Sequence, residues 1–206
     1  MGVRERRGRE KSATRDKILD AARELFLACG YEGVTMRKVA QAIEYSPTAI
    51  YVHFADKEAL FRELCVTDFR KLAHVFREIA AIADPAERLL KAGLAYADFG
   101  ASHPNHYRVM FMTPHPARGH SADLEKGNPE EDAYAFLKAT VKDALRAGRF
   151  RPELKDAELI AQTLWAGVHG VVSLEIAKRD DAWVDWRDYR KRVRLMTGSL
   201  LRGLLK

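Results

Sequence analysis

The chain has 206 residues, of which 47% are hydrophobic, so it is long enough to bury a substantial core. Its formal net charge of +6 and its pI near 9.3 favour an acidic partner such as nucleic acid or an anionic surface. The two cysteines, Cys29 and Cys65, lie far apart without a Cys-x-x-Cys spacing, which argues against a structural zinc site or a redox pair.

The first 17 residues form a basic arm, with seven Lys or Arg residues against three acidic ones. Two interpretations stay open for the part before Ser12: a disordered, solubilising terminus, or a contact with DNA. No apolar segment follows the arm, and no run of about 18 apolar residues occurs anywhere. The sequence therefore predicts a cytoplasmic protein that neither is secreted nor spans a membrane.

Apolar residues recur three and four positions apart along nearly the whole chain, a pattern typical of helices. The fold class expected is therefore all-α. A first helix should run from about Thr14 to Cys29 and end at Gly30. A second should run from Met36 to about Ile43, and Pro47 should open a third.

The later helices are expected over longer segments, and the prolines mark where several of them begin or end. The predicted helical ranges are Asp56 to about Ala83, Pro85 to about Ser102, Asn105 to Met112, Pro129 to about Gly148, Asp156 to Arg179 and Asp185 to Leu205. The longest loop should follow Met112. No clear linker separates independent domains, so the division into residues 12–62 and 63–206 is placed by function.

Two short helices joined by a tight turn on a longer first helix predict a helix-turn-helix, whose second helix lies in the DNA major groove. The edge of that second helix is made of small residues, which let the backbone approach base edges. The residues expected at DNA are Thr35, Arg37, Ser46, Pro47, Thr48, Ala49, Tyr51, His53 and Lys57. The last three are suited to phosphate oxygens.

The whole N-terminal pattern resembles the TetR (tetracycline repressor-like) family of transcriptional regulators. The resemblance covers roughly residues 12–62 and rests on Thr14-Arg15, Ile18-Leu19-x-Ala21-Ala22-x-x-Leu25-Phe26-x-x-x-Gly30-Tyr31, Thr35-Met36-x-x-Val39-Ala40, Ser46, Ile50-Tyr51-x-His53-Phe54 and Lys57-Glu58-x-Leu60. It implies a homodimer that has an N-terminal three-helix DNA-binding domain and a larger C-terminal helical bundle. That bundle is expected to bind a small-molecule effector.

The resemblance assigns Tyr51, His53 and Lys57 to phosphate contacts, Thr35 to a helix cap and residues 46–49 to the base-facing edge. Two positions depart from the family pattern. Glu44 stands where the family usually has a turn glycine, and Thr48-Ala49 replaces the common Gly-Thr. Glu44 places an acidic side chain near DNA. It would also have to adopt the left-handed conformation, which is costly for a residue other than glycine.

The segment Trp165-Ala-Gly-Val-His169-Gly170 resembles the Trp-His-Gly class of C-terminal domain in the same family. Aromatic and Met side chains of the middle helices are expected to line the effector pocket, although such a set also fits a plain core. The pocket residues predicted are Tyr96, Phe99, Met110, Phe111, Phe136, Trp165 and His169. For His169, a hydrogen-bonded core histidine is favoured over a ligand contact.

The last two helices carry more apolar surface than a lone pair of edge helices should expose, and in the family they form a four-helix dimer interface. The dimer residues predicted are Val168, Val171, Val172, Val193, Met196 and Leu200.

Two other functions are less well supported by the residues. His103, His106, His115 and His120 lie close together in sequence, but their spacing does not match a metal centre, and we expect no cofactor and no enzyme activity. A helical adaptor that has lost DNA binding is the other alternative, with Glu44 as its best argument.

Overall fold

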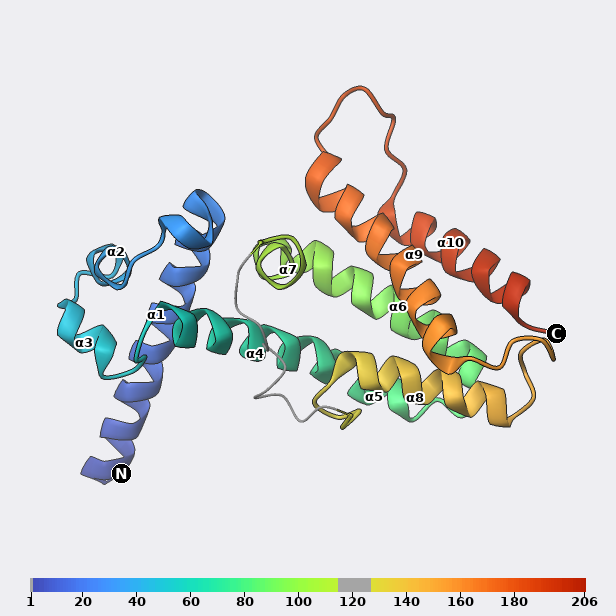
Figure 1. Ribbon diagram of the computed structural model, residues 1–206, viewed down its shortest axis with the longest axis horizontal. Helices are drawn as coiled ribbons and strands as arrows, with labels where there is room; N and C mark the ends of the chain where they lie inside the picture. Colours follow the sequence, from blue (N-terminus) through green and yellow to red (C-terminus); the bar gives the residue numbers. More distant parts are fainter. Residues whose placement is uncertain (1, 115–126) are drawn as a thin grey trace. The chain divides into compact units, whose positions relative to one another are not determined.

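The computed structural model describes residues 2–114 and 127–206, and within these ranges it is helical without any strand (Figure 1). The expected all-α fold is confirmed. In chain order the helices are α1 (Val3–Gly33), α2 (Met36–Ala42), α3 (Pro47–Tyr51), α4 (Lys57–Val75), α5 (Arg77–Ala80), α6 (Pro85–Ser102), α7 (Pro104–Phe111), α8 (Ala133–Arg146), α9 (Ala157–Lys178) and α10 (Tyr189–Leu204). His115 and His120 lie outside the described residues.

The chain divides into two compact units, and α4 contributes to both of them. Unit 1 comprises Met1–Asp68 and Asn105–Asp123, and unit 2 comprises Phe69–Pro104 and Leu124–Lys206. Unit 1 therefore contains α7 in addition to the N-terminal helices. The division at residues 62 and 63 stays a prediction.

The core of unit 1 is built from the apolar face of α1. Ile18, Ala22 and Phe26 are buried, as their three- and four-residue spacing predicts. The Phe26 ring packs edge-on against Phe61 of α4, with centroids 4.7 Å apart, and stacks on Tyr31 at 5.7 Å. This aromatic cluster fixes the end of α1 against the start of α4.

The first helix begins at Val3 rather than near Thr14, so the basic arm is helical. Arg, Glu and Lys are good helix formers, and the i,i+4 pair between Arg6 and Glu10 adds support at 3.0 Å. Gly30 interrupts the helix as expected, because its φ of 68° is the left-handed conformation that glycine adopts readily.

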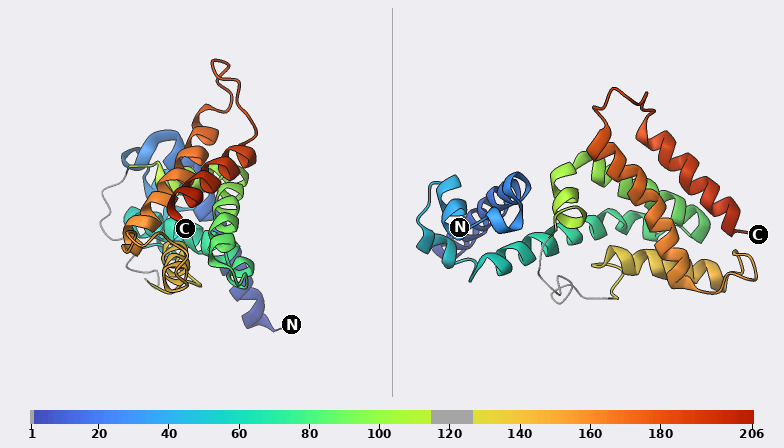
Figure 2. Two further views of the ribbon diagram at one scale, coloured as in Figure 1. Left: turned by 90° about the vertical axis from the view of Figure 1, so that its right-hand side faces the viewer. Right: turned by 45° about the horizontal axis from the view of Figure 1, so that its top comes forward.

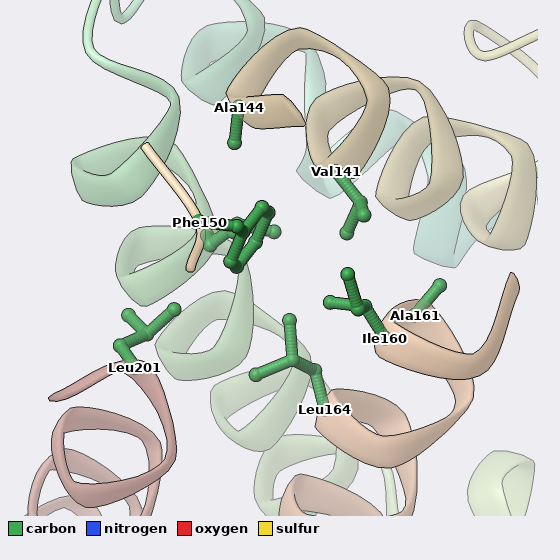
Figure 3. Packing of buried hydrophobic residues seen from close by; sticks show 8 residues of the cluster. Val141, Ala144, Phe150, Ile160, Ala161, Leu164 and Leu201 are labelled. Carbon is green, nitrogen blue, oxygen red and sulfur yellow. The ribbon is translucent and has the colours of Figure 1, made fainter. Parts of the chain in front are cut away.

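The core of unit 2 is formed by α6, α8, α9 and α10. Its buried cluster contains Leu89, Val141, Ala144, Phe150, Ile160, Ala161, Leu164 and Leu201, seven of which are labelled in Figure 3. Beside this cluster, α9 and α10 approach closely at Gly167. A Cβ atom at Gly167 would lie 2.6 Å from Met196 Sδ and 2.8 Å from Leu200 Cδ1, so a larger residue there would require these two side chains to move.

Three predicted helix boundaries in unit 2 were wrong. The helix expected from Asp185 begins at Tyr189, because the Asp188 side chain caps it by accepting a hydrogen bond from Lys191 N. The helix expected from Pro129 begins at Ala133, because the Asp132 side chain caps it by accepting hydrogen bonds from the backbone N–H groups of Tyr134 and Ala135. The helix expected to continue to about Ala83 ends at Val75, and the short α5 follows Phe76.

The helix α9 is long and apolar enough, by length and composition alone, to cross a membrane. A single helix of this kind is a weak indication of a membrane span, because core helices of soluble proteins pass the same test. The connection between α9 and α10, residues 179–188, projects beyond the ends of both helices (Figures 1 and 2). Trp183 within it is 90% exposed.

Candidate nucleic-acid interface and the polar cluster of unit 2

Side-chain caps define both short helices of the helix-turn-helix. Thr35 Oγ1 accepts a hydrogen bond from Lys38 N at 3.2 Å and so starts α2. Ser46 Oγ accepts one from Ala49 N at 3.2 Å and starts α3, with Pro47 in its first turn. The sequence predicts the cap at Thr35, whereas Ser46 was expected only at the base-facing edge of α3. Both caps hold very short helices in place despite their low intrinsic stability.

The turn between α2 and α3 depends on Glu44. Its φ of 59° is the only positive φ of a residue other than glycine in the described parts of the chain. The turn is held by hydrogen bonds from Glu44 N to Gln41 O at 3.2 Å and from Tyr45 N to Ala40 O at 2.9 Å. The prediction that Glu44 adopts the left-handed conformation is confirmed.

The helix α3 is anchored by one side chain and exposes the rest of its edge. Ile50 is fully buried, whereas Ser46, Pro47 and Thr48 are exposed. Ala49 is partly buried, and Tyr51 is 53% exposed. The N-terminal edge of α3 is therefore a narrow, accessible rim of small side chains, with a phenol one turn further on.

His53 lies in the junction between α3 and α4, where it is partly buried. Burial, and then the nearby positive charges of Lys11 and Arg15, lower the pKa of His53. Its Nδ1 atom is buried without a hydrogen-bond partner. Arg15 fixes this junction, because its Nη1 donates to His53 O at 3.3 Å and its guanidinium lies 4.5 Å from the centre of the Phe54 ring. The sequence did not single out this role of Arg15.

Lys57 is held against the end of α1. Its Nζ donates to Tyr31 O at 3.0 Å, lies 4.2 Å from the centre of the Tyr31 ring and pairs with Glu32 at 3.7 Å. Arg37 is exposed on α2. The phosphate contact of Lys57 and the DNA contact of Arg37 stay predictions.

A buried ionic cluster joins three helices of unit 1. Asp68 of α4 is fully buried and accepts hydrogen bonds from Arg23 Nη2 of α1 at 2.9 Å and from Arg23 Nε at 3.3 Å. His106 Nδ1 of α7 lies 2.7 Å from Asp68 Oδ1. No local sequence pattern indicates this cluster, and the sequence suggested for His106 only the rejected role of a metal ligand. Among the described residues, no group of His, Cys, Asp and Glu is arranged to hold a metal ion.

A second polar cluster lies in unit 2 and brings together three of the predicted pocket residues. The hydroxyl of Tyr96 accepts a hydrogen bond from Trp165 Nε1 at 3.1 Å and lies 3.2 Å from His169 Nδ1. Burial lowers the pKa of His169, which favours the neutral form of its ring. The favoured interpretation of His169 as a hydrogen-bonded histidine agrees with this geometry.

Tyr134 extends this cluster on the α8 side and was not among the predicted residues. Its ring centroid lies 5.8 Å from that of Trp165, and its hydroxyl donates to Glu158 Oε1 at 2.5 Å. Burial, and then the hydrogen bond to Glu158, raise the pKa of Tyr134 to about 12.

The other predicted pocket residues pack elsewhere. Phe99 stacks on His103 at 5.0 Å, and Phe136 stacks on Phe76 at 5.0 Å. Met110 and Phe111 belong to unit 1 rather than unit 2. A single pocket lined by all seven residues stays a prediction.

Three of the predicted dimer residues are buried within the chain itself. Val168, Val172 and Val193 pack inside unit 2, while Val171, Met196 and Leu200 are partly buried. The exposed apolar residues of the same two helices are instead Leu159 and Leu174 of α9 and Leu195 of α10.

Two family models match the chain, and both describe the same family. The model "Bacterial regulatory proteins, tetR family" matches residues 18–64, which contain the helix-turn-helix. The model "Tetracyclin repressor-like, C-terminal domain" matches residues 89–188. The chain belongs to the TetR family. Its assignment to the Trp-His-Gly class stays a prediction.

The sequence relatives of this TetR-family chain match only part of their own length. The HTH-type transcriptional repressor AcnR of Corynebacterium diphtheriae is 42% identical over 69 residues, which are 34% of this chain and 36% of that protein. The chain thus spans about a third of the length of such curated relatives.

Solved structures resemble the whole fold at lower identity. The regulator FadR from Bacillus subtilis, solved in complex with stearoyl-CoA, is 17% identical, with a TM-score of 0.74 over 91% of this chain and 97% of that one. The TetR family regulator PfmR from Thermus thermophilus is 23% identical, with a TM-score of 0.68 over 92% and 99%. At these identities the likeness shows the fold.

Proposed function

We propose that this TetR-family protein is a cytoplasmic transcriptional regulator that binds a palindromic operator as a homodimer and acts as a ligand-responsive repressor. The observation that carries this proposal is the exposed edge of α3, residues 46–49, on a helix capped by Ser46 and anchored by Ile50. Such an edge fits into the major groove, where Thr and Ala methyl groups touch thymine methyls. Family membership and the names of the sequence relatives support it.

The proposed readout separates base contacts from phosphate contacts. Substitutions at Thr48 or Ala49 should change which sequence is preferred, because these side chains face bases. Tyr51→Phe and Lys57→Ala should weaken binding to all sequences alike, because their partners are phosphates. Unchanged affinity in the Lys57 variant would contradict its phosphate role and agree with the hydrogen bond to Tyr31 as its whole function.

The dimer is proposed to form through the exposed apolar residues of α9 and α10. Leu174 is 48% exposed and Leu195 is 69% exposed, and Leu159 of α9 is 59% exposed as well. A symmetric partner would cover that surface, since a two-fold interface uses the same patch on both copies. Leu195→Asp should yield monomers in light scattering. A dimer that persists in this variant would show that the interface lies on another surface.

The effector is proposed to bind beside Tyr96, Trp165 and His169. These groups combine aromatic surface with hydrogen-bonding atoms, the composition usual in small-molecule sites. The stearoyl-CoA in the FadR structure makes acyl-CoA thioesters a reasonable first set of compounds to screen. Effector binding would change the separation of the two α3 helices of the dimer. These helices must lie in successive major grooves about 34 Å apart to bind the operator. Crystals with and without effector that show equal separations would reject this mechanism.

The deciding experiment is footprinting of the purified protein on DNA from upstream of its own gene at two salt concentrations. A protected palindromic site whose affinity falls steeply with salt supports the regulator. Weak binding without salt dependence would favour an adaptor that has lost DNA binding.

A further inference from the structure

The basic arm presents an ordered row of positive charge, which we call the basic stripe and define as Arg7, Lys11 and Arg15. These residues are four positions apart on α1, and all lie within the helix that begins at Val3. Side chains at i and i+4 lie on one face of a helix. Because the arm is helical, the three positively charged side chains lie on the same face of α1.

The basic stripe continues the buried face of α1. Further along the helix, the same line of positions holds Ile18 and Ala22, which are buried in unit 1. Arg7 and Lys11 lie before the point where the core begins, and they are exposed. The stripe therefore faces the side of α1 on which the other helices of unit 1 pack.

The inner end of the stripe lies at the junction of α3 and α4. Arg15 Nη1 donates to His53 O at 3.3 Å, and Arg15 Nη2 pairs with Glu63 at 2.9 Å. Lys11 is close enough to His53 for its charge to help lower the pKa of that ring. The row of charge thus begins beside the C-terminal end of the recognition helix and runs away from it along α1.

The acidic residues of the arm do not interrupt this row. Glu10 lies three positions after Arg7 and borders the stripe, but its carboxylate pairs with Arg6 at 3.0 Å, and Glu5 accepts a hydrogen bond from Gly2 N at 3.0 Å. Lys17 is also exposed on the side of α1 away from the stripe. The helix therefore has one face on which the described charges are all positive.

We propose that the basic stripe binds phosphates of the DNA backbone that flank the bases read by α3, an inference that rests on the proposed DNA-binding function. At 1.5 Å per residue, Arg7 and Arg15 are roughly 12 Å apart along the helix. Phosphates on one strand follow each other at about 3.4 Å along the axis, so this length matches three to four of them. The arm adds contacts that fix position and affinity without reading sequence.

The test compares two double variants that remove the same charge from opposite faces of α1. Arg7→Ala with Lys11→Ala removes the exposed part of the stripe, and Arg6→Ala with Lys17→Ala is the matched control. Alanine keeps the helix, which circular dichroism would verify. Affinity for the footprinted operator is measured from low to high salt, and hydroxyl-radical footprints are recorded for each protein.

The stripe variant should lower the slope of log K against log salt by about 3 to 4 for a dimer, because about 0.9 is lost for each phosphate contact. Its footprint should lose protection at both outer flanks, while the control keeps the wild-type slope and footprint. Equal losses in both double variants would show a general effect of charge and overturn the proposal. An unchanged slope in the stripe variant would overturn it too, while leaving the proposed regulator intact. Failure of the wild-type protein to bind any site would instead reject the proposed function.

Discussion

The two units hold their helices together with different kinds of polar cluster. In unit 1 the cluster is ionic, with Arg23 and His106 around the buried carboxylate of Asp68. In unit 2 the groups at the centre of the cluster are neutral, with Trp165 and His169 around the hydroxyl of Tyr96. A buried charge that loses its partner is strongly destabilising, whereas a neutral hydroxyl can exchange partners at a smaller cost. The ionic cluster thus suits a fixed scaffold, and the neutral one suits a site where a ligand replaces internal hydrogen bonds.

The largest expected effect tests the ionic cluster. Asp68→Ala should lower the free energy of unfolding by about 3–5 kcal/mol, because it leaves the buried Arg23 guanidinium without its carboxylate. Urea denaturation measures the loss. Asp20→Ala is the control, since Asp20 also pairs with Arg23 at 2.7 Å but is itself largely exposed, and this variant should lose less than about 1 kcal/mol. Similar losses in the two variants would remove the distinction between a buried and a surface pair.

A smaller effect is expected from the neutral cluster. Tyr96→Phe keeps the ring and removes the hydroxyl that contacts both Trp165 and His169, which should lower stability by about 1–3 kcal/mol. Thermal unfolding would show this. Tyr45→Phe, an exposed tyrosine in unit 1, should change nothing measurable. A loss as large as that of Asp68→Ala would mean that the two clusters are equally rigid.

The pH dependence of stability should distinguish the clusters further. Burial lowers the pKa of His169 in the folded state, so below the unfolded value of about 6.5 the unfolded chain binds the proton more readily. Stability is therefore full above about pH 6.5 and falls as the pH drops through the lowered pKa of the folded state. His169→Gln should reduce this fall. His53 acts in the same direction, so part of the dependence should remain in the variant. An unchanged profile would contradict a neutral His169.

The smallest effect concerns the turn of the helix-turn-helix. Glu44→Gly should stabilise unit 1 by about 0.5–1 kcal/mol, because glycine relieves a left-handed strain of roughly 1–2 kcal/mol but adds freedom to the unfolded chain. Ala28→Gly, at an exposed position of α1, should instead destabilise by about 1 kcal/mol. Loss of stability at both positions would show that Glu44 makes a favourable contact that outweighs its backbone strain.

Sequence reasoning succeeded where structure is decided locally. The cap at Thr35, the start of α3 at Pro47 and the left-handed Glu44 follow from a few neighbouring residues. The helix-turn-helix was also predictable, because the family pattern consists of residues at fixed spacings within a short segment.

The same reasoning failed where distant residues meet. Arg23 and Asp68 are 45 residues apart, and Tyr96 and His169 are 73 apart, so no local pattern pairs them. The exposed Leu195 was not among the predicted dimer residues, for a related reason. Val193 is apolar on a helix, but only tertiary packing decides that it is buried while Leu195 is exposed. The start of α8 was also predicted wrongly, since the helix begins at Ala133, after its cap Asp132, rather than at Pro129.

The placement of the three tryptophans determines what intrinsic fluorescence can report. Trp165, Trp183 and Trp186 all lie in unit 2. Tryptophan fluorescence therefore reports changes in that unit and is nearly insensitive to changes in the helix-turn-helix. Trp165 sits in the neutral cluster, whereas the exposed Trp183 contributes a constant, red-shifted background. A protein carrying Trp183→Phe would therefore give a cleaner optical titration of compounds that reach Trp165.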